Sequence, residues 1–363
     1  MMGWTLFFYF FRRYLATFIQ FFVGICIIAY LVDFTELSRV KSTMAGYKFG
    51  KGLLISALHV PLIAQLALPF VVLFAAIATL MALNRRYELV IARSAGVSAW
   101  QFLGPFCAAS LLIGAIIVLI VNPVGAHALA WSQQLEVSLK GEDDIDNPTD
   151  DRVPWLRQRD DDGITVIGAK SMAAGGIQLG RAVFVRVGLS GDITERIDAD
   201  SARLEAGKWV IEGATVRRPD KAPELVDRLE IKSNLSPEFV EEKLARPEAI
   251  PFFDLPAKMR AAWSFGLNGN GFGMQFHSLI ALPALLVAMT LIAATVSMRF
   301  ARLGQSVTMI LSGVLAGFLL YVISVLVKAF GTAGIVPPVV AAWIPVVVAM
   351  FFGVTFLLYR EDG

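Results

Sequence analysis

The stretch LPFVVLFAAIATLMALNRRYELVIARSAGVSAW, residues 68–100, joins one long apolar run to another through a short charged segment. The first run extends back to residue 53, and the second begins near residue 102. As a helix, about 20 apolar residues cross the ~30 Å hydrocarbon core of a bilayer. The stretch therefore predicts two membrane spans that are connected by a short charged loop.

The rest of the chain repeats this pattern. Charged residues make up only 17% of the 363 residues, against about 25% in an average soluble domain, and they gather in the middle third. Six apolar segments are long enough to be spans: residues 14–32, 53–83, 102–121, 274–298, 307–330 and 339–359. We expect an α-helical polytopic membrane protein with three parts, residues 1–121, 122–273 and 274–363.

Basic residues near the short loops predict the orientation, because cytoplasmic loops are enriched in Lys and Arg. Eight arginines fall on one side of a six-span arrangement: Arg12, Arg13, Arg85, Arg86, Arg93, Arg299, Arg302 and Arg360. We therefore expect both termini in the cytoplasm and the long insert outside it. The loop after the first span runs against the rule, with Arg39, Lys41, Lys48 and Lys51.

The insert, residues 122–273, contains short runs in which apolar and polar residues alternate, such as AVFVRV (182–187) and KWVIEGATV (208–216). Alternation with period two is typical of half-buried strands. The segment EAGKW (205–209) is typical of a hairpin turn. These patterns predict a small antiparallel all-β domain, a sandwich or jelly roll.

Several kinds of chemistry have no sequence support. The chain lacks a nucleotide-binding G-x-x-x-x-G-K-[ST] motif, an H-E-x-x-H motif and any Cys/His metal spacing. His59, His127 and His277 lie near span ends, where packing or interfacial roles are expected. Cys26 and Cys107 lie in apolar spans and are expected to act as small apolar residues. We predict no catalytic site, metal or cofactor in this chain, and the net charge of +2 gives no nucleic-acid signal.

The centres of the predicted spans contain no ionisable residue that could move protons, so the sequence shows no internal energy source. Segment 84–96 has an apolar stripe at helical spacing, Glu88 in its first turn and Gly96 as a helix terminator. Ser98 is suited to cap the next helix. One interpretation is a helix that rests on lipid. The other is a coupling helix that binds a cytosolic ATPase, and the missing ATP motif favours it.

The chain resembles the LptF/LptG permease family of the lipopolysaccharide export ABC transporter over its whole length. RRYELVIARSAGVS (85–98) is similar to the coupling helix of that family, and VDFTELSR (32–39) to its V-D-F-x-E stretch. FARLGQS (300–306) and IVPPVVAAWIP (335–345) resemble the second half. SAWQFLGPF (98–106) is more similar to the G-type than to the F-type subunit.

The resemblance implies a Gram-negative inner-membrane permease that pairs with an F-type permease over a dimeric cytosolic ATPase, which uses ATP and Mg. Lipopolysaccharide would enter between the first span of one permease and the fifth span of the other. It would then pass through the β domains to a single-span bitopic protein and a periplasmic bridge protein. The residues expected to couple to the ATPase are Glu88, Leu89, Ile91, Ala92, Ala95 and Gly96.

Basic residues at the outer mouth have two interpretations. Arg39, Lys41 and Lys328 are candidates for contact with lipid phosphates, through charge-assisted hydrogen bonds. Ordinary interfacial anchoring, or snorkelling in the case of Lys328, would place the same residues there.

Other functions also remain open at the level of the sequence. The chain could be a membrane scaffold or sensor with a periplasmic β domain, or a mechanically acting ABC permease for another lipid or for lipoproteins. A scaffold would not need a coupling helix. An intramembrane enzyme is the least favoured class, because the spans show no nucleophile–base or metal set.

Overall fold

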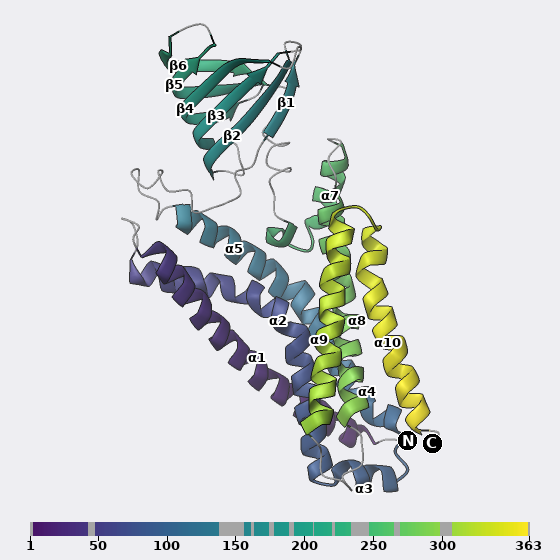
Figure 1. The fold of residues 1–363 in the computed structure, drawn as a ribbon. Helices are drawn as coiled ribbons and strands as arrows, with labels where there is room; N and C mark the ends of the chain where they lie inside the picture. Colours follow the sequence, from purple (N-terminus) through teal and green to yellow (C-terminus); the bar gives the residue numbers. More distant parts are fainter. Residues whose placement is uncertain are drawn as a thin grey trace.

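The computed structural model describes residues 3–42, 48–137, 156–160, 163–173, 178–188, 192–205, 207–219, 222–233, 247–264, 269–297 and 307–361. It has a helical part and a β sheet inserted between helices (Figure 1). Among the described residues, six helical segments are long and apolar enough to cross a membrane. The predicted class, a six-span helical protein with an inserted antiparallel β domain, is confirmed.

The helices extend beyond the predicted spans. Their bounds are α1 Trp4–Lys41, α2 Phe49–Arg85, α3 Glu88–Ser94, α4 Ala99–Ile116, the π-helix η1 Ile117–Val121, α5 Asn122–Val137, the 3-10 helix η4 Pro247–Ala249, α7 Leu255–Ser264, α8 Asn270–Ser297, α9 Val307–Thr332 and α10 Pro338–Glu361. The third span is thus a continuous helical path, α4–η1–α5, which runs well into the region assigned to the insert. Sequence analysis did not identify α5 as a helix.

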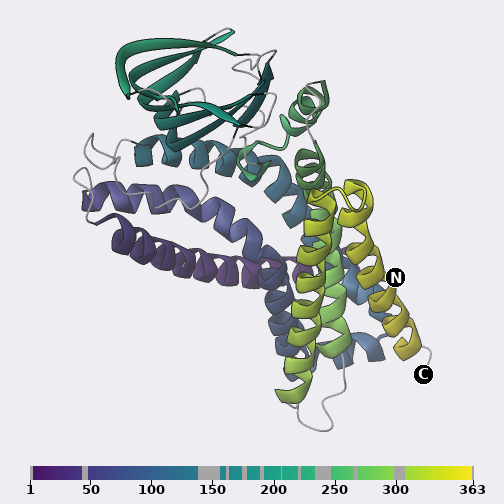
Figure 2. The same cartoon turned by 45° about the horizontal axis from the view of Figure 1, so that its top comes forward.

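Three helical segments lean away from the others and form what we call the arm: α1, the first half of α2, and α5 (Figures 1 and 2). The second half of α2 turns to run beside α8. Pro61 and Pro69 lie inside α2, and a proline removes a helical hydrogen bond and permits a bend. Helices α4, α8, α9 and α10 make up the remaining bundle.

The core of the bundle is apolar, with one buried chain of hydroxyl groups. Tyr14 Oη lies 2.9 Å from Ser110 Oγ, which lies 2.6 Å from Thr290 Oγ1. All three residues are fully buried, and they come from α1, α4 and α8. Because hydroxyl groups in an apolar interior need partners, these hydrogen bonds fix the N-terminal part of α1 against the bundle.

Six strands form one antiparallel sheet in the order β1-β2-β3-β4-β5-β6. Their bounds are β1 Leu156–Asp160, β2 Gly163–Ala173, β3 Gln178–Val187, β4 Ile193–Glu205, β5 Lys208–Arg217 and β6 Glu224–Lys232. Each strand pairs with its sequence neighbours, which is the order of a meander. Glu205 pairs with Lys208 across the predicted hairpin, where Gly207 adopts φ +79°.

The sheet is strongly curved (Figure 2), and its two edge strands meet at one place. Gln158 of β1 donates to the Lys232 carbonyl of β6 at 3.1 Å and accepts from Ser233 Oγ at 2.8 Å. Inside the curve lies an apolar cluster in which Phe184 packs edge-on against Trp209, both fully buried. Side chains therefore fill the interior of the domain in this conformation.

The crossing of α4 and α8 provides a test of the helical packing. A Cβ atom on Gly114 would lie 2.5 Å from Pro283 Cα and 2.8 Å from Pro283 Cβ, whereas a Cβ on Gly24 of α1 would meet nothing within 4 Å. We expect Gly114→Ala to lower the free energy of unfolding by about 1–3 kcal/mol, because the two backbones must separate. Gly24→Ala should leave it unchanged or raise it by up to about 1 kcal/mol. Thermal unfolding in detergent measures both, and equal melting temperatures would contradict the close crossing.

Candidate functional site

The short helix α3 is delimited by local signals at both ends. Tyr87 adopts φ 59° just before it, and Glu88 occupies the first turn, where a carboxylate favours the helix dipole. After it, Gly96 adopts φ +83° and the Val97 amide donates to the Ala92 carbonyl at 3.1 Å, as in a Schellman cap. Ser98 Oγ then accepts from the Gln101 amide and caps α4, as predicted. The helix is shorter than the predicted 84–96, because α2 continues to Arg85.

The residues predicted to couple to an ATPase divide into two groups. Leu89 and Ala92 are only 6% and 8% exposed and face the bundle. Ile91 is 64% exposed, and Ala95 and Gly96 are exposed as well. The buried pair therefore seats α3 on the helical bundle, and a partner can reach the exposed group.

Glu88 lies between these groups and binds α1. Its Oε1 accepts from Arg13 Nη1 at 2.9 Å, and its Oε2 accepts from Tyr9 Oη at 3.1 Å. Arg13 also donates to Tyr9 Oη at 2.6 Å and lies over the Tyr9 ring. The side chains of Arg13 and Glu88 are 20% and 24% exposed. We call Tyr9, Arg13 and Glu88 the inner junction.

From the sequence, Arg13 is expected only to help set the orientation, and no local pattern marks Tyr9 as a partner of Glu88. The pair Arg13 and Glu88 is separated by 75 positions, which no helical or strand period connects. The only signal available was complementary charge on two segments that were both expected at the same side of the membrane.

The three basic residues proposed for lipid phosphates do not come together within this chain. Arg39 is exposed near the C-terminal end of α1, and Lys41 is the last residue of that helix. Lys328 lies near the end of α9 and donates from Nζ to Gln275 Oε1 of α8 at 3.0 Å. The end of α1 lies at the tip of the arm and the end of α9 in the bundle (Figures 1 and 2).

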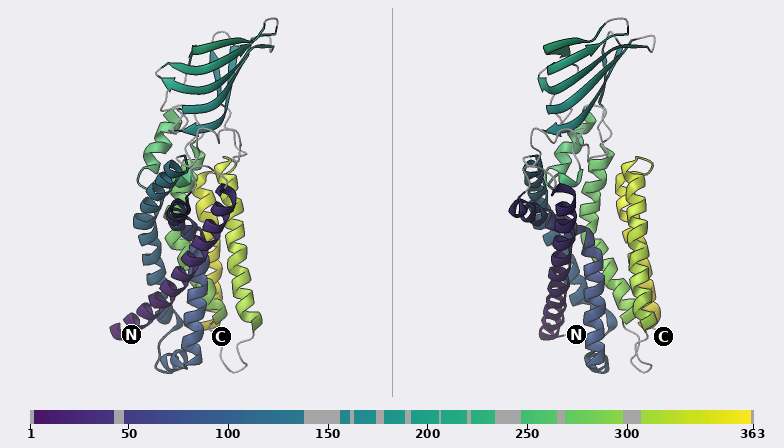
Figure 3. Two further views of the ribbon diagram at one scale, coloured as in Figure 1. Left: turned by 90° about the vertical axis from the view of Figure 1, so that its left-hand side faces the viewer. Right: turned by 60° about the vertical axis from the view of Figure 1, so that its left-hand side comes forward.

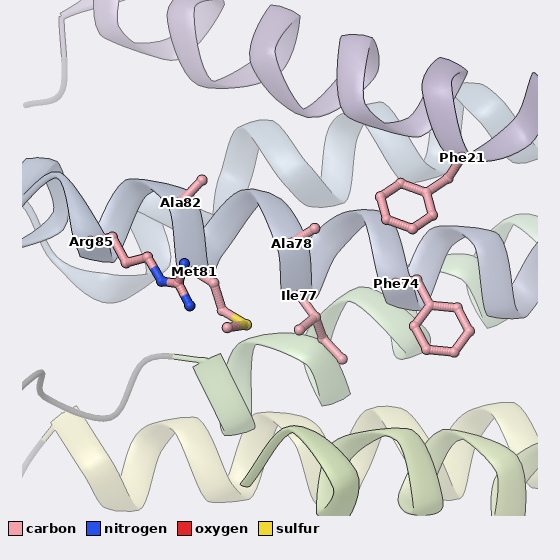
Figure 4. A pocket seen from close by; sticks show the side chains of 7 residues that line it. All are labelled: Phe21, Phe74, Ile77, Ala78, Met81, Ala82 and Arg85. Atoms are coloured by element: carbon pink, nitrogen blue, oxygen red, sulfur yellow. The ribbon is translucent and has the colours of Figure 1, made fainter. Parts of the chain in front are cut away.

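A pocket of about 290 Å³ lies beside α2 near α3 (Figure 4). Its lining is apolar apart from one arginine at the end nearest α3, and consists of Phe21, Phe74, Ile77, Ala78, Met81, Ala82 and Arg85. Phe21 projects from α1 toward α2, and the other six side chains come from α2 (Figure 4). Within the described part of the chain, no group of three or more His, Cys, Asp or Glu residues could hold a metal ion.

The division of α3 into a buried and an exposed side predicts different effects on stability. We expect Leu89→Ala to lower the free energy of unfolding by about 2–3 kcal/mol, because it leaves a cavity under α3. Ile91→Ala should change it by less than about 0.5 kcal/mol, because the side chain is exposed. Thermal unfolding of the isolated chain in detergent measures the difference. Equal losses for the two variants would show that α3 does not sit on the bundle through Leu89.

The arrangement is that of a polytopic membrane protein with a short helix exposed between its second and third spans and a β domain at the opposite end. A comparison with curated protein sequences finds no match. The family model described as lipopolysaccharide export system permease LptF/LptG matches residues 8–360, nearly the whole chain. The chain therefore belongs to the LptF/LptG family, the multi-pass inner-membrane permeases of the lipopolysaccharide export transporter.

Proposed function

We propose that this chain is a G-type permease that works with an F-type permease and a dimeric cytosolic ATPase to extract lipopolysaccharide from the outer leaflet of the inner membrane. The observation that carries the proposal is the uneven burial of the spans. We compare the most apolar 18-residue stretch of each span. Only 6% of these residues are buried in α1 and 17% in α9, whereas 61% are buried in both α2 and α8. The two spans that would form the lipid gates are thus the two least covered by their own chain.

The exposed apolar residues of these helices extend along their length. Those of α1 include Ile19, Val23, Ile27, Ile28, Leu31 and Val32, and those of α9 include Leu311, Leu315, Phe318, Val322 and Leu326. Lipid tails or a partner helix must cover such surfaces, because neither face suits water. A gate between α1 of one permease and α9 of the other would place both faces against the cargo or the partner.

Helix α3 is suited to receive force from the ATPase. It carries exposed Val90 and Ile91, exposed Tyr87 lies just before it, and it is seated on the bundle through Leu89. ATP and Mg would be bound by the ATPase, so this chain would hold neither cofactor and carry no catalytic residue.

The relative positions of the ends and the basic residues support one orientation. Both termini and α3 lie at one end of the helical part, and the β sheet lies at the other (Figure 3). Arg85 and Arg86 precede α3, and basic residues favour the cytoplasmic side. We therefore place both termini in the cytoplasm and the β domain in the periplasm.

Basic residues at the outer ends would serve two different gates. Arg39 lies two residues before the end of α1, which would meet the fifth span of the partner permease at one gate. Lys328 lies in α9, which meets the first span of the partner at the other. Each would contact a lipid phosphate through a charge-assisted hydrogen bond. Lys41 would act beside Arg39.

The β domain would hand the cargo onward. An acyl chain can enter its interior only if the side chains around Trp209 and Phe184 rearrange, because these fill the curve of the sheet. The next carriers would be the single-span bitopic protein, which has a similar β domain, and then the periplasmic bridge protein.

The exposed face of α3 predicts a specific loss of assembly. We expect Ile91→Glu to weaken binding of the ATPase by about 30-fold or more, because a carboxylate would replace an apolar side chain in the contact. The control is Ile335→Glu, which changes an equally exposed isoleucine in the loop between α9 and α10. Co-purification of the ATPase from detergent extracts measures both. If the ATPase co-purifies normally with Ile91→Glu, the exposed face of α3 is not part of the contact with the ATPase.

The function itself is tested by reconstitution. The complete complex in proteoliposomes should release lipopolysaccharide to a soluble acceptor only when ATP is present. ATP-dependent release of phospholipid or lipoprotein in place of lipopolysaccharide would assign a different cargo to this chain.

A further inference from the structure

A second polar contact joins the three helices of the arm at their outer ends. His59 Nδ1 of α2 lies 3.2 Å from both carboxylate oxygens of Asp33 of α1, and His59 Nε2 lies 3.1 Å from Ser132 Oγ of α5. We call Asp33, His59 and Ser132 the outer junction. It ties together positions that are 26 and 73 residues apart in the chain.

An apolar contact supports the outer junction one helical turn away. Leu37 of α1 and Ile55 of α2 are buried together, with Leu135 of α5 packed against them. Each of these residues lies three or four positions from a member of the outer junction, on the same helix. The same three helices are therefore held by a polar layer and an adjacent apolar layer.

Ser, His and Asp also form the catalytic set of many hydrolases, but this arrangement does not suit that role. Ser132 is fully buried, and its hydroxyl donates to the Leu129 carbonyl of its own helix at 2.7 Å. A nucleophile must reach a substrate. The geometry is therefore that of a structural connection between helices.

The two junctions sit at opposite ends of the membrane-spanning part of α1. Arg13 and Asp33 are separated by 20 positions in one continuous helix, which corresponds to about 30 Å, the thickness of the hydrocarbon core. The inner junction joins α1 to α3, and the outer junction joins α1 to α5, after which the chain continues into the β domain.

Helix α1 has the properties of a rigid connection. It is 38 residues long and contains no proline, whereas α2, α4, α8 and α10 each contain at least one. Proline is the commonest cause of a helix kink. Between the junctions, one side of α1 packs against α2, and the residues on its other side are partly or fully exposed.

We propose that α1 is a rod that transmits the movement of α3 to the outer end of the arm, through the inner junction at one end and the outer junction at the other. The proposal rests on the proposed function, in that the ATPase moves α3. It assigns positioning roles to Tyr9 and Arg13 at the inner end and to Asp33, His59 and Ser132 at the outer end. Movement of α5 would then reach the base of the β domain.

The test uses Arg13→Gln and His59→Leu in the complete reconstituted complex. We expect each to reduce the lipopolysaccharide released per ATP hydrolysed by about tenfold, within the usual range of coupling between sites, while the ATPase still co-purifies. Because the two junctions of a rod act in series, the double variant should lose no more coupling than the single variant with the larger loss. Arg13→Lys, which keeps the charge, should recover most of the coupling.

Two controls match the junctions in chemistry. Thr35→Val changes an exposed residue of α1 that lies two positions from Asp33 and whose hydroxyl donates to the Val32 carbonyl of the same helix. Exchanging Lys208 and Glu230 reverses an exposed ion pair on the β domain. Complexes with either control variant should release lipopolysaccharide at the normal rate. Additive losses in the double variant, a single variant without effect, or loss of ATPase binding in Arg13→Gln would each overturn the proposal.

A second measurement does not depend on cargo. With Cys26 and Cys107 replaced by serine, spin labels are attached at positions 35 of α1 and 335 of the loop between α9 and α10. The distance between them should change when the complex is trapped with ATP, and Arg13→Gln should abolish that change. If the distance between the two labels changes by the same amount in Arg13→Gln, the proposal is overturned. Failure of the unmodified complex to release lipopolysaccharide, with the distance change intact, would instead reject the proposed cargo.

Discussion

The hydrocarbon core of the membrane offers no hydrogen-bond partners, so each backbone must satisfy its own polar groups and each polar side chain must find another. The helices of this protein meet the first condition by their regular bonding. Charged contacts lie near the two ends of α1, and hydroxyl and amide groups pair in the buried core, as Asn122 does with Gln65. Tyr14, Ser110 and Thr290 are the example at depth. Polar contacts therefore occur at a few defined levels, and these levels set where helices are joined.

The same constraint explains how α1 is positioned. Along its middle it presents apolar side chains to lipid or to a partner, and such contacts have little directional preference. At its ends it is held by atoms with specific partners, Arg13 with Glu88 and Asp33 with His59. These contacts connect α1 to α3 at one end and to α2 and α5 at the other, which is the arrangement that the proposed rod requires.

Much of the fold could be predicted from the sequence. The six spans, the antiparallel β insert, the short helix after α2, its termination at Gly96 and the Ser98 cap are all encoded by local patterns of hydrophobicity and capping. Boundaries were less accurate. Helix α5 continues the third span through η1 into the region assigned to the insert. The sequence did not predict this helix because its composition is mixed, and its packing partner is the distant helix α2. The resemblance to the permease family agreed with the match over residues 8–360.

The candidate site was predicted only in part. Local sequence placed Glu88 and Ile91 on a short exposed helix, but did not distinguish the buried Leu89 and Ala92 from the exposed residues beside them. The sequence by itself determined which segments cross the membrane and which side chains are polar, because transfer from water to lipid depends on composition and length. Only the tertiary structure decided that Glu88 binds Arg13 and that His59 binds Asp33 and Ser132. Those partners are brought together by the way the helices cross, and a crossing depends on the packing of distant surfaces that no local period records.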